Sequence, residues 1–316
     1  MPVPDFIESA PSLASAVSRA FTVFGAAPHL GSRDASGRWR WRSYAETGEE
    51  AAALAAGLAS AVGLPRRSGV GILSRNRDEW LLTDWACALD DFLVLGIHPA
   101  WDAAKVAHVL ADAQLSCVVV SAEALPLLIQ AKLLGAPQLL LAVLLPGDGS
   151  ERDAETAEAA GLRIVRYSDV LAAGRQSRAT HTGAGFGADA ASRPDPADDN
   201  DAVFTLMYSS GTSGGPPKAV ATPKSTWRKT NLVGPLAGIA SPDDRRAVSY
   251  MPLAHGADRG VCWFTTMAGG RIGMVAAEPG TDEFYADLKE VKPAFLLGMS
   301  CAYSARHSLG AITFLI

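Results

Sequence analysis

The chain has 316 residues, of which 48% are hydrophobic and 19% are charged, and its net charge is −5. This length can bury a sizeable core, and this composition excludes an intrinsically disordered chain. Because the chain has no net basic charge, nucleic acid is excluded as the expected main partner.

Predicted helices and strands alternate over the first 175 residues. Ser43 and Glu46 have the spacing of a capping box, which predicts a helix that runs to about Ala61. Asp102 can likewise cap a helix that runs to about Ala113. Apolar periodicity predicts a further helix over 77–89 and strands over 69–74, 117–121, 139–145 and 162–165. The alternation indicates a mostly parallel α/β sheet, which presents its ligand loops at the carboxyl ends of its strands.

The amino-acid composition changes after the first 175 residues. Residues 176–200 are rich in Gly, Ala, Ser, Asp and Pro and predict a flexible linker. Regular patterns then return, with strands expected over 202–208, 219–222, 247–251, 271–275 and 294–299 and helices over 227–239 and 282–291. We therefore expect a first α/β lobe over 1–175, the linker, and a second α/β lobe over 201–316.

A loop rich in glycine and small hydroxyl residues follows the strand predicted over 202–208. It begins at Ser209, ends at Lys218, and contains Ser210, Gly211, Thr212, Ser213 and Gly214. Such residues let the backbone approach a phosphate, donate N–H and O–H groups to it, and add a positive charge at the end of the loop. An ordinary surface turn is the alternative on composition alone. A Walker loop is excluded, because Pro216 stands where its second glycine belongs and Ala219 follows the lysine.

This loop resembles the phosphate-binding signature of the adenylate-forming superfamily, Tyr-Thr-Ser-Gly-Thr-Thr-Gly-x-Pro-Lys-Gly. The match runs from Ser209 to Gly214 with Ser–Thr exchanges, and it departs from the signature by one extra residue before Lys218 and by Ala219 in place of glycine. Further segments resemble the family in the same order, and two of them are most similar to long-chain acyl-CoA synthetases. Those two are 70–80, VGILSRNRDEW, and 250–255, YMPLAH.

The resemblance implies a fold and a reaction. It implies an α/β fold, that of the N-terminal domain of adenylate-forming enzymes, with mixed, mostly parallel sheets flanked by helices. It also implies that ATP, with Mg²⁺, activates a carboxylic acid to acyl-AMP, and that coenzyme A then takes the acyl group. A long-chain fatty acid is the implied substrate. The cofactor-binding residues would be Ser209, Ser210, Gly211, Thr212, Ser213, Gly214 and Lys218.

His255 is the residue that we single out for a catalytic role. The resemblance places it where the family's loop borders the acyl and nucleotide pockets, and the alternative is a hydrogen-bonded loop histidine with no direct role. We interpret Asp258 and Arg259 as a structural ion pair at a helix start. We expect Trp80 and Trp85 to be core residues, and we expect the Gly269–Gly270 pair to serve backbone geometry.

The cysteines and the N-terminus indicate the compartment. Four cysteines without a C-x-x-C pair (Cys87, Cys117, Cys262 and Cys301) disfavour a disulfide framework or a metal site, and we expect small buried thiols in a reducing compartment. No basic segment followed by an apolar run opens the chain. We expect a cytoplasmic protein whose partners are small-molecule substrates, and we leave open peripheral contact with a membrane surface.

The family's later motifs are not found in this sequence. They are a Tyr-Gly-x-Thr-Glu-type segment for adenine and Mg²⁺, an aspartate for the ribose, and a lysine on a mobile C-terminal domain. We therefore expect a truncated second lobe and a weakly active or inactive chain. Two other functions stay open: a non-catalytic nucleotide- or acyl-binding module, and an adenylation domain of an assembly-line synthetase.

Overall fold

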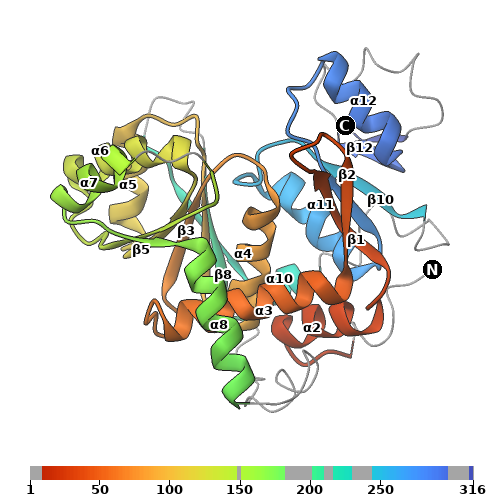
Figure 1. Ribbon diagram of the computed structural model, residues 1–316, viewed down its shortest axis with the longest axis horizontal. Helices are drawn as coiled ribbons and strands as arrows, with labels where there is room; N and C mark the ends of the chain where they lie inside the picture. Colours follow the sequence, from red (N-terminus) through yellow and green to blue (C-terminus); the bar gives the residue numbers. More distant parts are fainter. Residues whose placement is uncertain are drawn as a thin grey trace.

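Seven strands form the central sheet of the computed structural model, which describes residues 9–147, 151–181, 201–209, 216–229, 244–297 and 313–315. Their spatial order is β7-β6-β5-β3-β4-β8-β9 (Figure 1). The strands are β3 (Gly69–Leu73), β4 (Leu93–Ile97), β5 (Cys117–Val120), β6 (Leu141–Leu144), β7 (Arg163–Arg166), β8 (Val203–Tyr208) and β9 (Ala219–Pro223). All neighbours are parallel except β8 and β9, which are antiparallel. The expected mostly parallel sheet is confirmed.

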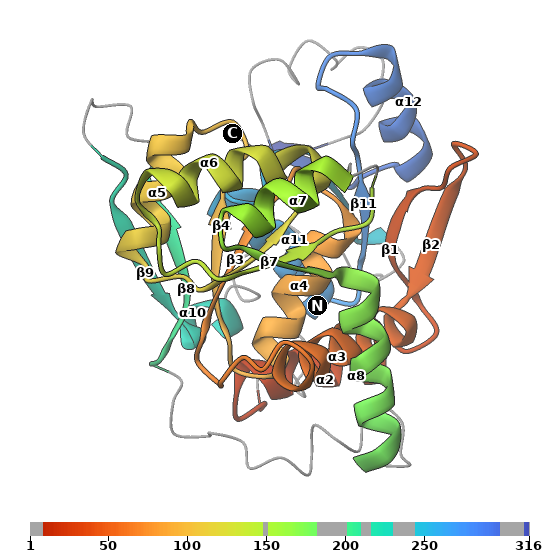
Figure 2. The same cartoon turned by 60° about the vertical axis from the view of Figure 1, so that its left-hand side comes forward.

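Helices cover both faces of this sheet, as Figure 2 shows. One layer holds α2 (Leu13–Val23), α3 (Tyr44–Ser60), α4 (Asp78–Leu89) and α8 (Tyr167–His181), and the other holds α5 (Ala103–Asp112), the short helix η1 (Ala122–Ala124), α6 (Leu125–Gly135) and α7 (Glu151–Ala159). Side chains of a strand alternate between the two layers. In β5, Cys117 and Val119 join the core cluster of the first layer, whereas Val118 and Val120 join that of the second.

A second sheet has four strands in the order β10-β11-β1-β2. They are β1 (Pro28–Arg33), β2 (Trp39–Ser43), β10 (Arg246–Ser249) and β11 (Arg271–Met274), and the helices beside them are α11 (Gly256–Met267) and α12 (Asp282–Val291). The short helix α10 (Lys224–Lys229) instead contacts α2 and the strands β8 and β9 of the first sheet. β1 lies parallel to β11 and antiparallel to β2. A separate parallel pair is formed by β12 (Phe295–Leu297) and β13 (Thr313–Leu315).

The two sheets do not follow the expected division into lobes over 1–175 and 201–316. β8 and β9 complete the sheet that β3 to β7 begin, and β1 and β2 join β10 and β11 in the second sheet. The physical reason is that β4 and β11 each offer a free edge whose N–H and C=O groups must be paired. Each sheet therefore combines strands from both halves of the chain.

Several local predictions are confirmed. Ser43 Oγ accepts from the Glu46 N–H at 3.2 Å while the Glu46 carboxylate accepts from the Ser43 N–H at 2.7 Å, so α3 begins with a capping box. Trp80 and Trp85 are fully buried, as are Cys87, Cys117 and Cys262, whereas Cys301 lies outside the described residues.

The linker prediction is corrected at its start. α8 continues to His181, so residues 176–181 are helical, and residues 182–200 lie outside the described part of the chain. Among the described residues, no helix combines the length and the apolar character that crossing a membrane requires.

Candidate functional site

The predicted phosphate loop connects β8 to β9, and its two ends are held together. The Ser209 N–H donates to the Lys218 carbonyl at 3.0 Å, and the Lys218 N–H donates to Ser209 Oγ at 3.0 Å. We call Tyr208, Ser209, Pro217 and Lys218 the loop neck. Lys218 is exposed there, whereas the predicted residues Ser210, Gly211, Thr212, Ser213 and Gly214 lie outside the described residues.

A small pocket opens beside the loop neck, at the carboxyl ends of β4 and β8. Its volume is about 110 Å³, and its lining consists of Gly96, His98, Ala100, Trp101, Tyr208, Ala254 and His255. A glycine at position 96 is required, since a Cβ there would lie 2.8 Å from the Ala254 Cα. The pocket brings His255, the predicted catalytic residue, to the same edge of the sheet as the loop neck.

His98 gives this pocket a hydrogen-bond donor. Its Nδ1 accepts from the Ala100 N–H at 3.1 Å, so the proton of the neutral ring is on Nε2. Burial, and next the neighbouring His255, lower the pKa of His98, and the two ring centroids are 5.9 Å apart. At neutral pH, His98 therefore offers an uncharged N–H group to a ligand oxygen.

Asn76 holds the turn that carries His255. Its amide nitrogen donates to Ser249 Oγ at 2.9 Å and to the Met251 carbonyl at 2.7 Å. Its amide oxygen accepts from the Leu253 N–H at 3.0 Å. With three hydrogen bonds from one side chain, the segment between β10 and α11 has a defined path, and His255 is the N-cap residue of α11.

The predicted ion pair between Asp258 and Arg259 is wrong. Arg259 instead forms a bidentate pair with Asp84 of α4, with N–O distances of 2.5 and 2.7 Å. Ser249 donates to the Asp258 carboxylate at 2.6 Å. Successive side chains on a helix point about 100° apart, so the two residues face different neighbours. Burial raises the pKa of Asp258 to about 7.

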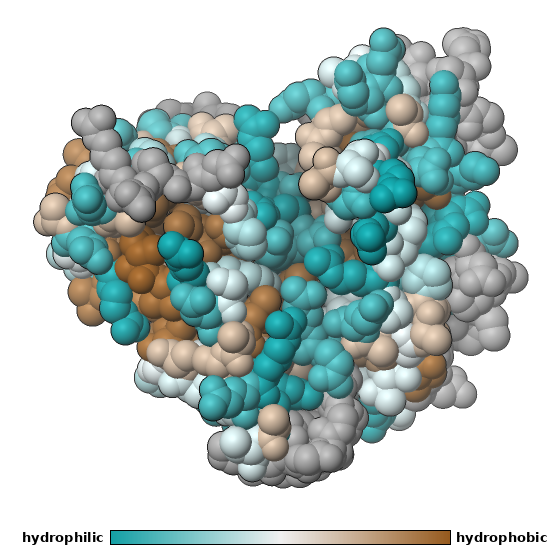
Figure 3. Space-filling view, viewed as in Figure 1, coloured by the Kyte–Doolittle hydropathy of each residue, from teal (hydrophilic) through white to brown (hydrophobic). Residues whose placement is uncertain are grey.

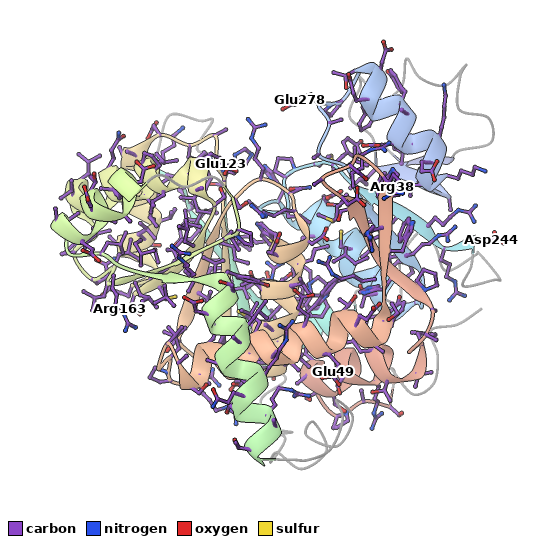
Figure 4. All side chains as sticks on the ribbon, viewed as in Figure 1. Arg38, Glu49, Glu123, Arg163, Asp244 and Glu278 are labelled. Carbon is purple, nitrogen blue, oxygen red and sulfur yellow. The ribbon has the colours of Figure 1, made fainter. Side chains whose placement is uncertain are left out.

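A larger cleft of about 510 Å³ lies between the two sheets, and Figure 3 shows the surface hollowed there. In Figure 4, Glu123 and Glu278 are labelled on the two sides of the gap between the two halves of the molecule, and Glu278 pairs with Arg75 at 3.2 Å. The charges that line the cleft are largely paired: Arg42 binds Asp78, and Arg33 binds Asp287 at 2.5 Å. Because these pairs satisfy one another, the smaller pocket beside the loop neck is the better candidate for chemistry, despite its size.

Sequence reasoning missed part of the site. His98 and Trp101 follow β4, a strand that was not among those predicted, although the apolar run Leu93–Ile97 before His98 was a usable signal. Asn76 was identified only as part of the segment 70–80, which resembles the family. Its contacts connect residues that are more than 170 positions apart, and no local pattern reveals them.

Within the described ranges, no group of three or more His, Cys, Asp or Glu side chains is placed to hold a metal ion. The Ser209 hydroxyl group, whose oxygen accepts from the Lys218 N–H, keeps its own proton to donate, and both this group and the Lys218 ammonium group are suited to phosphate oxygens.

Comparisons with known proteins agree on one family. The family model described as AMP-binding enzyme matches residues 19–305. Acyl-CoA ligase 891, peroxisomal, of Penicillium brevicompactum is 29% identical over 280 residues, which cover 84% of this chain and 37% of that protein. Long chain acyl-CoA synthetase 6, peroxisomal, of Arabidopsis thaliana is 27% identical over 272 residues, which cover 85% and 35%.

A solved structure matches the fold over nearly the whole chain. It is the A-PCP didomain of the carboxylic acid reductase from Segniliparus rugosus, in complex with AMP, with a TM-score of 0.75 and 19% identity over 97% of this chain and 45% of that chain. The present chain thus spans less than half the length of this structure and of both curated relatives.

Proposed function

The chain belongs to the family of AMP-binding enzymes, and from this premise we propose that it uses ATP to activate a carboxylic acid as an acyl-adenylate. The acyl group would then pass to the thiol of coenzyme A. The observation that carries this proposal is the loop neck, which places Ser209 and Lys218 together beside the pocket of His98 and His255.

The loop neck has the chemistry for a nucleotide's phosphates. Ser209 and Lys218 supply a hydroxyl group and an ammonium group at the carboxyl end of a strand, where α/β sheets bind their ligands. Lys218 is exposed, so its amine is free to approach a phosphate oxygen. The remaining residues of the predicted set, Ser210, Gly211, Thr212, Ser213 and Gly214, stay part of the proposal through the family's signature.

The pocket supplies the place for the acid. A volume of about 110 Å³ is well below the ~300 Å³ of common ligand pockets, so it fits the carboxyl end of an acid and not a long chain. The His98 N–H group can donate to a carboxylate oxygen and fix its direction. We assign His255, on the facing wall, to orienting the same group.

The proposed reaction balances in two steps. A carboxylate oxygen attacks the α-phosphorus of ATP, the bond from that phosphorus to the bridging oxygen breaks, and pyrophosphate leaves with its electron pair. The thiolate of coenzyme A then attacks the acyl carbon, and AMP leaves. Within this sequence Lys218 offsets negative charge on the phosphates, and the pocket holds the carboxylate in line.

A long-chain fatty acid is the proposed substrate, because both curated relatives are acyl-CoA ligases or synthetases, one of them long-chain. An adenylation domain that passes the acyl group to a carrier-protein thiol is the second candidate. The likeness to the reductase didomain favours it only at the level of the fold. The two differ in which thiol accepts the acyl group.

Acid-dependent exchange of labelled pyrophosphate into ATP tests the proposal. We expect weak exchange in the 316-residue chain, and more of it with acids of about 12 to 18 carbons than with acetate. Lys218→Ala removes a charge-assisted hydrogen bond, so ATP affinity should fall about 10- to 100-fold. Lys289→Ala, which removes an exposed lysine on α12, is the matched control and should bind ATP normally.

One outcome would decide against this function, and another would decide against the role of Lys218. ATP binding without exchange for any acid would overturn the ligase proposal and favour a nucleotide-binding module. Equal ATP affinity in the Lys218 and Lys289 variants would remove Lys218 from the phosphate site.

A further inference from the structure

One helix holds both ends of the loop neck. The His108 side chain of α5 contacts the Pro217 carbonyl through Nε2 at 3.1 Å, and Tyr208 Oη donates to Asp112 Oδ2 at 2.6 Å. Since Pro217 O can only accept, His108 Nε2 is the donor. His108 and Asp112 are four residues apart and lie on the same face of α5.

We propose that His108 and Asp112 are positioning residues. They fix the position of the loop neck relative to α5, and they thereby fix the position of Lys218 at the edge of the sheet. His108 binds Pro217, the residue directly before Lys218, and Asp112 binds Tyr208, the residue directly before Ser209. Two hydrogen bonds to one helix fix both the distance of the loop neck from α5 and its orientation. This inference rests on the proposed function for its effect on ATP, but its geometric part is independent of that function.

The departure from the family's loop signature supports this assignment. The extra residue lies within Gly215-Pro216-Pro217, and the carbonyl that His108 binds belongs to that segment. Proline has no N–H group, so Pro217 cannot be held through a main-chain donor of its own. Pro217 is buried, and its carbonyl is held by the histidine. Without that donor, a buried acceptor loses its hydrogen bond, which is costly.

The hydrogen-bond partner of Asp112, Tyr208, is buried. Tyr208 is 8% exposed, and burial, followed by the hydrogen bond to Asp112, raises the pKa of its hydroxyl group. The phenol therefore stays protonated and donates at every physiological pH. The Tyr208 ring also lines the pocket with His98 and His255, so α5 supports the wall between that pocket and the loop neck.

ATP affinity in four proteins tests the His108 anchor. His108→Ala should weaken ATP binding about tenfold, the equivalent of about 1.4 kcal/mol. His108→Gln should recover most of this loss, because the glutamine amide can place an N–H donor near the position of Nε2. Gln138→Ala is the matched control: Gln138 also donates to a main-chain carbonyl, that of Leu110 in α5 at 2.8 Å, but not at the loop.

Limited trypsin digestion tests the geometry without ATP. Cleavage after Lys218, measured against cleavage after the exposed Arg75, should be several-fold faster in His108→Ala than in wild type, His108→Gln or Gln138→Ala. Equal cleavage ratios in all four proteins would overturn the positioning role, whether or not the chain binds ATP. If wild type binds no ATP but the ratio changes as expected, the proposed function fails and the anchor stands. If wild type binds ATP and His108→Ala binds it equally well, the effect of the anchor on the phosphate site is overturned.

Discussion

The guanidinium group of Arg259 is one of the most enclosed charges in the described part of the chain. Only 2% of its side chain is exposed, and Asp84, its partner, is fully buried. Arg259 Nη1 donates to Thr205 Oγ1 at 2.6 Å, and Arg259 Cζ lies 4.4 Å from the Trp227 ring centroid. Arg259 thereby ties α11, which begins at the His255 turn, to β8, which ends at the loop neck.

Removing this cation should be strongly destabilising. Arg259→Met would leave Asp84 buried without its charged partner, with only the Trp263 indole N–H donating to it at 2.7 Å, and should lower the free energy of unfolding by about 3–5 kcal/mol. Arg40→Met is the control, since Arg40 is 77% exposed and pairs with Asp34 at the surface, where such a pair contributes about 0–1 kcal/mol. Urea unfolding measures both, and similar midpoints for the two variants would contradict a structural role for the Arg259 network.

Two buried titratable groups affect stability in opposite directions as pH falls. Burial lowers the pKa of His29 to about 3 from 6.5, so below pH 6.5 the unfolded chain takes up a proton that the folded chain refuses. Burial raises the pKa of Asp258 to about 7 from 3.8, so between these values the folded chain binds the extra proton. Acidification therefore destabilises through His29 and stabilises through Asp258, and the two contributions nearly cancel between about pH 4 and 6.5.

Replacing one of the two groups should reveal the other. Asp258→Asn removes the stabilising contribution, so between pH 6.5 and 4.5 the variant should lose stability relative to wild type by about 1.4 kcal/mol per pH unit. Urea unfolding at three pH values measures the difference. Parallel stability curves for the two proteins over this range would show that Asp258 ionises normally in the fold.

At the scale of elements, α3 and α8 cross at unusually close range because of two glycines. A Cβ on Gly174 of α8 would lie 1.8 Å from the Ala53 carbonyl oxygen of α3. A Cβ on Gly57 of α3 would lie 2.0 Å from the Val170 carbonyl oxygen of α8. Each glycine thus lets the other helix's backbone approach, and this packing keeps α8 against the first layer.

A methyl group at this crossing should force the helices apart. We expect Gly174→Ala to cost at least about 1–3 kcal/mol, since the obstructing atoms belong to backbone and cannot rotate away. Gly135→Ala tests the substitution itself: nothing lies within 4 Å of a Cβ there, so its effect should be neutral or slightly stabilising. Thermal unfolding separates the two, and an unchanged midpoint for Gly174→Ala would rule out the close crossing.

The elements that sequence reasoning recovered are those with a local signal. The strand bounds expected for β3, β5, β6, β7, β8, β10 and β11 are within two residues of those observed, because each is a short apolar run with polar neighbours. β1 and β2 were missed, since β1 is completed by β11, more than 200 residues away. α8 was missed, since no helix was predicted over 167–181 and residues 176–181 were assigned to the linker, because glycine and serine suit a linker and the packing of α8 on α3 has no local signal.

At the scale of the whole molecule, the site forms where the two sheets meet. β4 and β8 of the seven-stranded sheet bring His98, Tyr208 and the loop neck, and β10 of the four-stranded sheet brings the turn with His255. The edge of the sheet was predictable from the α/β alternation, and so was the loop. The pairing of His98 with His255 was not, because it depends on how two sheets with interleaved strands lie together.

The proposed function requires a carboxylate to attack the α-phosphorus of ATP at this site. The most direct measurement uses a carboxylic acid labelled with ¹⁸O in its carboxyl group, together with ATP and coenzyme A, and follows the label by mass spectrometry. If the carboxylate attacks there, one ¹⁸O atom per turnover appears in AMP and none in pyrophosphate. Label in inorganic phosphate together with ADP, or no transfer of label for any acid, would contradict it.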